Sequence, residues 1–239
     1  MRQLLLIALC CASVAVADDL ATTGHSVGVL APRDGRGASA CPLMINSDGS
    51  YENAVTWKTG GQQPPYYGAF AECYLGPKAV CAFVADLTQI GNYTGQQADF
   101  YLWSNVRELN QDTPGGVVYM QPNVNLGAVA LWPNISRHVV DLPNPVAMEG
   151  RWWMGIWGHW VGTVNGWFVA SDVDGFGGCP MNNIAPGIGY PSGWQSTSLA
   201  FGPMGALGIG VQGQTISTSD VPEAPIRLTS FGKVKALYR

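Results

Sequence analysis

Tryptophans, glycines and two aspartates share one window of the sequence, where the indole rings can fill a core or bind a ligand and the carboxylates can hold a cation. The window between Arg151 and Gly178 reads RWWMGIWGHWVGTVNGWFVASDVDGFGG and holds five of the nine tryptophans. Such a window either anchors a large apolar core or presents flat aromatic rings to a ligand. Which of the two it does decides most of what the sequence says about function.

Alternation along a strand sorts the first half of this window onto two faces. The apolar face, which we predict to be core, carries Trp152, Met154, Ile156 and Trp160. The mixed face carries Arg151, Trp153, Trp157 and His159. Burying about 200 Å² of indole contributes about 5 kcal/mol at about 25 cal/mol/Å², which favours packing over display for Trp153 and Trp157.

The competing interpretation is an aromatic platform on which sugar rings stack, as in carbohydrate-binding modules. Its candidate ligand-binding residues combine the mixed face with aromatic residues from elsewhere in the chain: Trp153, Trp157, His159, Trp194, Tyr66 and Tyr67. Tyrosine and tryptophan suit such a surface because each joins a large apolar ring to a polar group. The two interpretations differ in one observable property, the exposure of the tryptophans.

An Asp-x-Asp-Gly run near the end of the window supplies two candidate calcium ligands, Asp172 and Asp174. Alternate carboxylates converge on a hard cation in calcium loops, and Gly175 permits the sharp bend. Twelve residues counted from Asp172 end at Asn183, where an EF-hand needs a bidentate glutamate. A turn without a cofactor is therefore the simpler interpretation, because Asp and Gly are preferred turn formers after a strand.

Catalytic signatures are scarce in this chain, which has no Gly-x-Ser-x-Gly elbow, no His-Glu-x-x-His and no P-loop. The run GIGVQG at 208–213 matches the dinucleotide fingerprint, but no helix is predicted after it to receive a pyrophosphate. Glycoside hydrolysis needs only two suitably spaced carboxylates, so a secreted glycoside hydrolase is the alternative function. Its candidate acids, each of which also fits a solvated strand end, are Glu52, Glu72, Asp99 and Glu149.

The first residues of the chain resemble a targeting segment. Arg2 precedes an apolar run from Leu4 to Val16 with a small-x-small ending, which predicts a secretory signal peptide over 1–17. The run is too short to cross a bilayer of about 30 Å as a permanent helix, and we expect no transmembrane segment. A lipid anchor on Cys10 or Cys11 is less favoured, because the preceding residue is not small. We therefore expect a secreted or extracytoplasmic protein, at the cell surface or in the periplasm.

Four cysteines follow this segment, and in an exported protein they predict disulfides. We expect Cys73 to pair with Cys81, because turn residues at 76–78 lie between two strand-like runs, and Cys41 to pair with Cys179. A zinc site is the weaker alternative, since no Cys-x-x-Cys pair exists and no histidine stands at ligand spacing from a cysteine.

The composition is that of many short strands joined by tight turns, with 47% hydrophobic residues, 12% charged residues, 31 glycines and 16 prolines. A formal net charge of −4 argues against nucleic acid as a partner. We predict strands at 54–58, 66–74, 79–87, 98–103, 117–121, 128–132, 137–142, 151–160, 166–171, 198–201 and 206–212. These runs predict an all-β fold, a two-sheet antiparallel β-sandwich of the jelly-roll kind.

The domain organisation follows from where these runs begin and end. A loose N-terminal arm is expected at 18–40, the sandwich at 41–216, a polar linker with prolines at 217–228 and a basic tail at 229–239. The tail carries three positive charges and no negative charge, and Ser230 is placed to cap a short helix. Such a helix is marginal alone, so the tail needs a docking partner, which export or envelope machinery would supply.

The tail TSFGKVKALYR resembles a short ending found on many uncharacterised secreted β-rich proteins of environmental bacteria, with Phe231 where tryptophan is commoner. The blocks ENAVTWKTGGQQPPYYGAFAE, GIWGHWVGTVNGWFVASDVDGFGG and NIAPGIGYPSGWQSTSLAFGPMGALGIGV are similar to the body domain that accompanies that tail. The resemblance implies export and a bacterial origin, and it brings no catalytic residue. We therefore predict a secreted or envelope-associated non-catalytic module that binds a glycan or surface partner or serves structurally.

Overall fold

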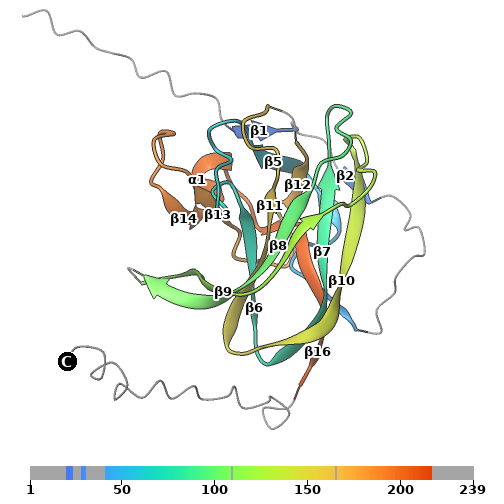
Figure 1. Ribbon diagram of the computed structural model, residues 1–239, viewed down its shortest axis with the longest axis vertical. Coiled ribbons are helices and arrows are strands. Elements are labelled where there is room, and N and C mark those ends of the chain that lie inside the picture. Colours follow the sequence, from blue (N-terminus) through green and yellow to red (C-terminus); the bar gives the residue numbers. More distant parts are fainter. Residues whose placement is uncertain (1–19, 24–27, 31–40, 109, 165, 217–239) are drawn as a thin grey trace, which may run out of the picture.

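Short aromatic and β-branched runs form two packed sheets in the computed structural model, which describes residues 20–23, 28–30, 41–108, 110–164 and 166–216 (Figure 1). The ten-stranded sheet contains β1 (Leu20–Thr22), β2 (Gly28–Leu30), β3 (Leu43–Ile45), β4 (Ser50–Tyr51), β5 (Asn53–Trp57), β7 (Lys78–Thr88), β10 (Asn134–Met148), β12 (Phe168–Asp172), β15 (Ala206–Leu207) and β16 (Ile209–Thr215). The six-stranded sheet contains β6 (Phe70–Leu75), β8 (Ala98–Glu108), β9 (Gln111–Val124), β11 (Arg151–Gly158), β13 (Met181–Ile184) and β14 (Gly193–Ser196). The predicted all-β, two-sheet antiparallel sandwich is confirmed.

The six-stranded sheet has the order β14-β13-β6-β11-β8-β9, and every neighbouring pair in it is antiparallel. The tryptophan-rich strand β11 therefore lies inside the sheet, where Trp153 pairs with Cys73 on β6 and with Trp103 on β8. The β8–β9 hairpin extends to the left of the view, below β13 and β14 (Figure 1). The sheet curls, so its edge strands β9 and β14 approach each other across the outer face.

The main core lies between the two sheets. The predicted apolar face of the tryptophan window is confirmed as core: β11 contributes Trp152, Met154 and Ile156, and Trp160 joins them from just after the strand. The ten-stranded sheet contributes Val55, Phe83, Leu87, Ile209 and Val211. Because period-two alternation puts these side chains on one side of each strand, the other side of β11 faces away from this core.

Two of the predicted strands are wrong. Residues 198–201 form the short helix α1 (Ser198–Phe201), because Thr197 begins a helical turn in which its carbonyl accepts the Phe201 amide. Residues 128–132 are irregular except for one bridge between Leu131 and Gln89. The sequence interpretation also missed β13 and β14, whose asparagine, glycine and serine residues resemble turns.

The four described cysteines form two disulfides, as expected, but the expected pairing is wrong. Cys41 bonds to Cys81, and Cys73 bonds to Cys179. The physical reason is that the turn at 76–78 joins β6 and β7, which belong to different sheets and do not pair as a hairpin. Two disulfides are typical of proteins that fold in an oxidising, extracytoplasmic compartment.

The expected loose N-terminal arm contains two strands. β1 pairs with β5, and β2 lies between β10 and β4, in parallel with β10. The predicted signal peptide, linker and basic tail fall outside the described residues. Among the residues that the structure does describe, no helix has the length and hydrophobicity needed to span a membrane.

Candidate functional site

The outer face of the six-stranded sheet carries a second apolar cluster, which we call the outer aromatic cluster. Its buried members are Ala69, Ala71, Tyr101, Trp103, Trp153, Trp157 and Met181. Small residues make room for these rings: a Cβ atom on Gly155 would lie 2.6 Å from the Trp103 ring and 2.2 Å from the Phe70 carbonyl oxygen. The Trp103 ring therefore lies directly over Gly155, where any side chain would collide with it.

Tyr66 and Trp194 cover this cluster and are half-buried. Their rings face each other at 6.4 Å between centroids, and Trp194 meets Trp103 edge-on at 5.2 Å. The Trp157 indole donates a hydrogen bond of 2.8 Å to the carbonyl oxygen of Tyr67. Trp153 and Trp157 are consequently 1% and 6% exposed, so packing is confirmed for both, and neither ring is displayed as an open stacking platform. Tyr66 and Trp194 reach solvent in their place.

An open hollow of about 450 Å³ adjoins the cluster. One wall is the tip of the β8–β9 hairpin, and the opposite wall is β13 and β14 with the residues that precede β13. Polar side chains line it together with Trp153, Met181 and Cys179; the polar residues are Asn110, Gln111, Asp112, Arg151 and Ser196. The Gln111 side-chain amide reaches across to the Met181 sulfur at 3.6 Å, which ties the two walls together.

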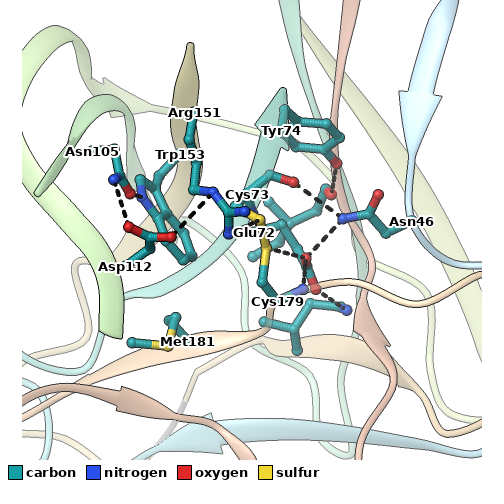
Figure 2. Close-up of a disulfide and its surroundings, with 12 residues drawn as sticks. Asn46, Glu72, Cys73, Tyr74, Asn105, Asp112, Arg151, Trp153, Cys179 and Met181 are labelled. Carbon is teal, nitrogen blue, oxygen red and sulfur yellow. Dashed lines mark hydrogen bonds and ion pairs between the residues drawn. A yellow bond between two sulfur atoms is a disulfide. The ribbon is translucent and has the colours of Figure 1, made fainter. Parts of the chain in front are cut away.

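A chain of polar contacts runs along the hollow from Trp153 to the disulfide (Figure 2). The Trp153 indole donates to Asn105 Oδ1 at 2.9 Å, and Asn105 Nδ2 donates to Asp112 Oδ1 at 3.0 Å. Asp112 Oδ2 lies 3.5 Å from Arg151 Nε, and Arg151 Nη1 lies 3.8 Å from Cys73 Sγ. The guanidinium is therefore held between a carboxylate and a sulfur atom.

Glu72 lies behind the disulfide and is fully buried. Its carboxyl group accepts hydrogen bonds from Asn46 Nδ2 at 2.9 Å and from the backbone amides of Cys179 at 3.1 Å and Leu207 at 2.7 Å. Burial penalises the charged form and raises the pKa of Glu72 to about 7, although these donors oppose the shift. Glu72 can therefore hold or release a proton near neutral pH.

His159, another predicted site residue, lies just after β11 and contacts Asp99 rather than the hollow. Its Nε2 is 2.6 Å from Asp99 Oδ1, and the Tyr101 hydroxyl donates to Asp99 Oδ2 at 3.2 Å. The Asn123 amide donates to the same carboxylate at 2.8 Å. Asp99 is thus fully engaged by its neighbours, and Tyr101, buried beside it, has a raised pKa.

The other candidate acids have separate partners. Glu52 accepts a hydrogen bond from the Val173 amide, and Glu149 is exposed in the turn between β10 and β11. Glu52 also joins the two predicted calcium ligands, since one oxygen each of Glu52, Asp172 and Asp174 lies within 4.8 Å of the others. Backbone amides of Asp48 and Asp174 already donate to Asp172, and its burial raises the pKa of that carboxyl group. Asp172 thus joins the bend that follows β12 to the loop at Asp48.

Sequence reasoning missed most residues of the hollow. It flagged Trp153 and Arg151 as neighbours in one strand but not Asn110, Gln111, Asp112 or Ser196, which reach the same place from distant segments. A usable signal was the density of amide and carboxylate residues at 105–112, NVRELNQD within a long hairpin. No protein-family model, curated protein or solved structure matches this chain.

Proposed function

We propose that this chain is an extracytoplasmic, non-catalytic binding module that takes a glycan chain in the hollow between the β8–β9 hairpin tip and β13–β14. The observation that carries the proposal is the hollow of about 450 Å³, walled by planar polar side chains, beside two half-buried aromatic rings. Sites for small ligands typically combine apolar and aromatic lining with a few converging polar groups.

The lining suits a neutral polyhydroxylated ligand. Asp112, Asn110 and Gln111 offer carboxylate and amide groups, and Arg151 offers a guanidinium, so neighbouring hydroxyls would find both donors and acceptors. Asp112 already balances the charge of Arg151 at 3.5 Å, which favours an uncharged ligand over a phosphate. The net charge of −4 also disfavours an anionic ligand.

The aromatic pair extends this surface beyond the hollow. Ser196 lines the hollow, and Trp194 stands on the same side of β14 two residues away, which is about 7 Å along a strand. Tyr66 faces Trp194 and continues the surface. Hollow and rings are thus contiguous, and a ligand of two or more sugar rings would bridge them.

Binding to a glycan array and to soluble polysaccharides tests the proposal. The wild-type chain should bind a neutral oligosaccharide, and Trp194→Ala and Gln111→Ala should each weaken binding about tenfold or more. Phe176→Ala is the matched control, because this aromatic side chain is 80% exposed and does not line the hollow. Its affinity should equal that of the wild type.

Other outcomes identify the other functions. Release of reducing sugar that is lost in Glu72→Gln or Glu149→Gln would indicate a glycoside hydrolase instead. Absence of any glycan binding, together with self-association in sedimentation at micromolar concentration, would indicate a structural envelope subunit. Either result would overturn the binding proposal.

A further inference from the structure

The Cys73–Cys179 disulfide stands at the edge of the hollow rather than inside the core. It joins β6 to the segment that precedes β13, and both of its cysteines are half-buried. Cys179 lines the hollow, next to Gly178 and Pro180. A small thiol can reach a disulfide sulfur from such a position, and access is the first requirement of thiol–disulfide exchange.

Charged groups flank the two sulfur atoms on opposite sides (Figure 2). Arg151 Nε faces Asp112, but Nη1 of the same guanidinium lies 3.8 Å from Cys73 Sγ, which leaves Nη1 to donate to a thiolate on Cys73. Glu72 Oε2 lies 4.0 Å from Cys179 Sγ, and the Cys179 amide holds the same oxygen at 3.1 Å. One sulfur is thus beside a fixed cation and the other beside a proton carrier.

Leaving-group stability controls disulfide cleavage, because the departing sulfur carries the electron pair of the broken bond. A thiolate next to a guanidinium has a lowered pKa and departs faster. A buried thiolate without such a partner needs a proton instead, and Glu72 is positioned to supply one. Cys73 therefore has a guanidinium to stabilise its thiolate, and Cys179 has a carboxyl group to protonate its sulfur when the disulfide breaks.

We propose that Cys73–Cys179 is a redox-exchanging disulfide: a dithiol reductant enters the hollow and attacks Cys179, Cys73 departs as a thiolate beside Arg151, and Glu72 exchanges a proton with Cys179. This activity goes beyond glycan binding and does not depend on it. The partner class is a dithiol, either a small molecule or a protein with a paired cysteine site.

The exchange balances in two steps. A thiolate of the reductant bonds to Cys179 Sγ while the Cys73–Cys179 bond breaks, and the electron pair leaves with Cys73. The second thiolate of the reductant then attacks the reductant sulfur that is bonded to Cys179. This closes a disulfide within the reductant, breaks the bond to Cys179 and releases Cys179, which takes the proton of Glu72. The reductant loses two electrons and two protons; the chain gains two electrons as one thiolate and one thiol, and water reprotonates Glu72.

The titratable groups around this site are few among the described residues. Tyr74, on the same strand as Glu72, is the titratable group that interacts with it electrostatically, and burial and that carboxyl group raise the pKa of Tyr74. Asp112 faces Arg151 from β9. The pKa of Glu72, raised to about 7, predicts an inflection near neutral pH in the exchange rate.

Native-state reduction of the full chain by dithiothreitol tests the proposal, with alkylation and peptide mapping to identify the thiols. Cys73–Cys179 should open at least about tenfold faster than Cys41–Cys81, which serves as the control in the same molecule. Arg151→Gln should slow the opening of Cys73–Cys179 about tenfold and leave the Cys41–Cys81 rate unchanged. Glu72→Gln should remove the inflection near pH 7 after correction for dithiothreitol ionisation.

Asn46→Ala provides a second route if Glu72→Gln does not fold. Asn46 donates to the Glu72 carboxyl group, so its removal should move the inflection to higher pH. The proposal is overturned if Cys41–Cys81 opens first, or if both disulfides open only with global unfolding. It is equally overturned if the rate and its pH profile stay unchanged in the folded Arg151 and Asn46 variants.

Discussion

The inner and outer faces of the six-stranded sheet carry similar aromatic side chains but are buried differently. On the inner face, Trp152 stacks on Tyr74 at 5.0 Å and packs with the ten-stranded sheet. On the outer face, half-buried Tyr66 and Trp194 pack against the cluster that holds Trp153 and Trp157. Alternation along a strand therefore assigns a side chain to a face of the sheet. The side chains that pack over that face decide whether it belongs to the core or to a surface.

Trp152→Ala should have the largest effect on stability. The indole is fully buried between the sheets, and its removal leaves a cavity that two packed layers cannot fill, so the free energy of unfolding should fall by about 5 kcal/mol. Urea unfolding followed by circular dichroism measures the loss. A loss under about 1 kcal/mol would mean that the inner face is not the main core.

Trp157→Ala measures how much a buried tryptophan of the outer face contributes to stability. This indole is 6% exposed and donates to the Tyr67 carbonyl oxygen, so the free energy of unfolding should fall by about 3 kcal/mol. Trp194→Ala is the control in the cover, where a half-buried ring should cost about 1 kcal/mol. Equal small losses for both variants would make the outer cluster an exposed platform.

Glu72→Gln tests whether the raised pKa of the Glu72 carboxyl group, on β6 beside the inner core, makes stability depend on pH. Its folded pKa of about 7 lies above the value of 4.5 expected when unfolded, so its contribution is fully present below pH 4.5 and is lost as pH rises through 7. Wild-type stability should fall by about 3 kcal/mol over that interval relative to the variant. Parallel pH profiles of the two chains in urea unfolding would contradict the raised pKa.

Gly155→Ala should have a smaller effect, confined to the outer cluster. The added Cβ would lie 2.6 Å from the Trp103 ring, so ring and backbone must shift, and the free energy of unfolding should fall by about 2 kcal/mol. Gly76→Ala is a poor match because its φ is positive, whereas Gly116→Ala meets only Ser104 Oγ at 3.6 Å and serves as control. A neutral Gly155→Ala would mean that Trp103 does not lie on the sheet.

The sequence predicted the sandwich and the sorting of the tryptophans, because both depend on local alternation. It could not predict burial on the outer face, since Tyr66 and Trp194 reach that face from a loop and an edge strand far from β11. The cysteine pairing failed for a similar reason: Cys73 and Cys81 are close in sequence, but β6 and β7 enter different sheets.

The sequence could not predict the hollow, for the same physical reason. Asp112 on β9, Arg151 on β11 and Ser196 on β14 come together only because the sheet curls and brings its edges close. Glu72 was singled out as an acid to inspect, but its expected place at a solvated strand end is wrong. Its alternation partners Phe70 and Tyr74 are both core residues, and that pattern was readable in advance.

Indole NMR resonances test directly whether Trp194 contacts a glycan while Trp152 stays in the core, because each tryptophan side chain reports on its own face of the sheet. A ¹H–¹⁵N spectrum of the folded chain would be titrated with the neutral oligosaccharide that binds best on the array. We expect the Trp194 indole signal to shift saturably while the Trp152 signal stays in place. No shift of Trp194 at saturating ligand, or a shift of Trp152 alone, would contradict it.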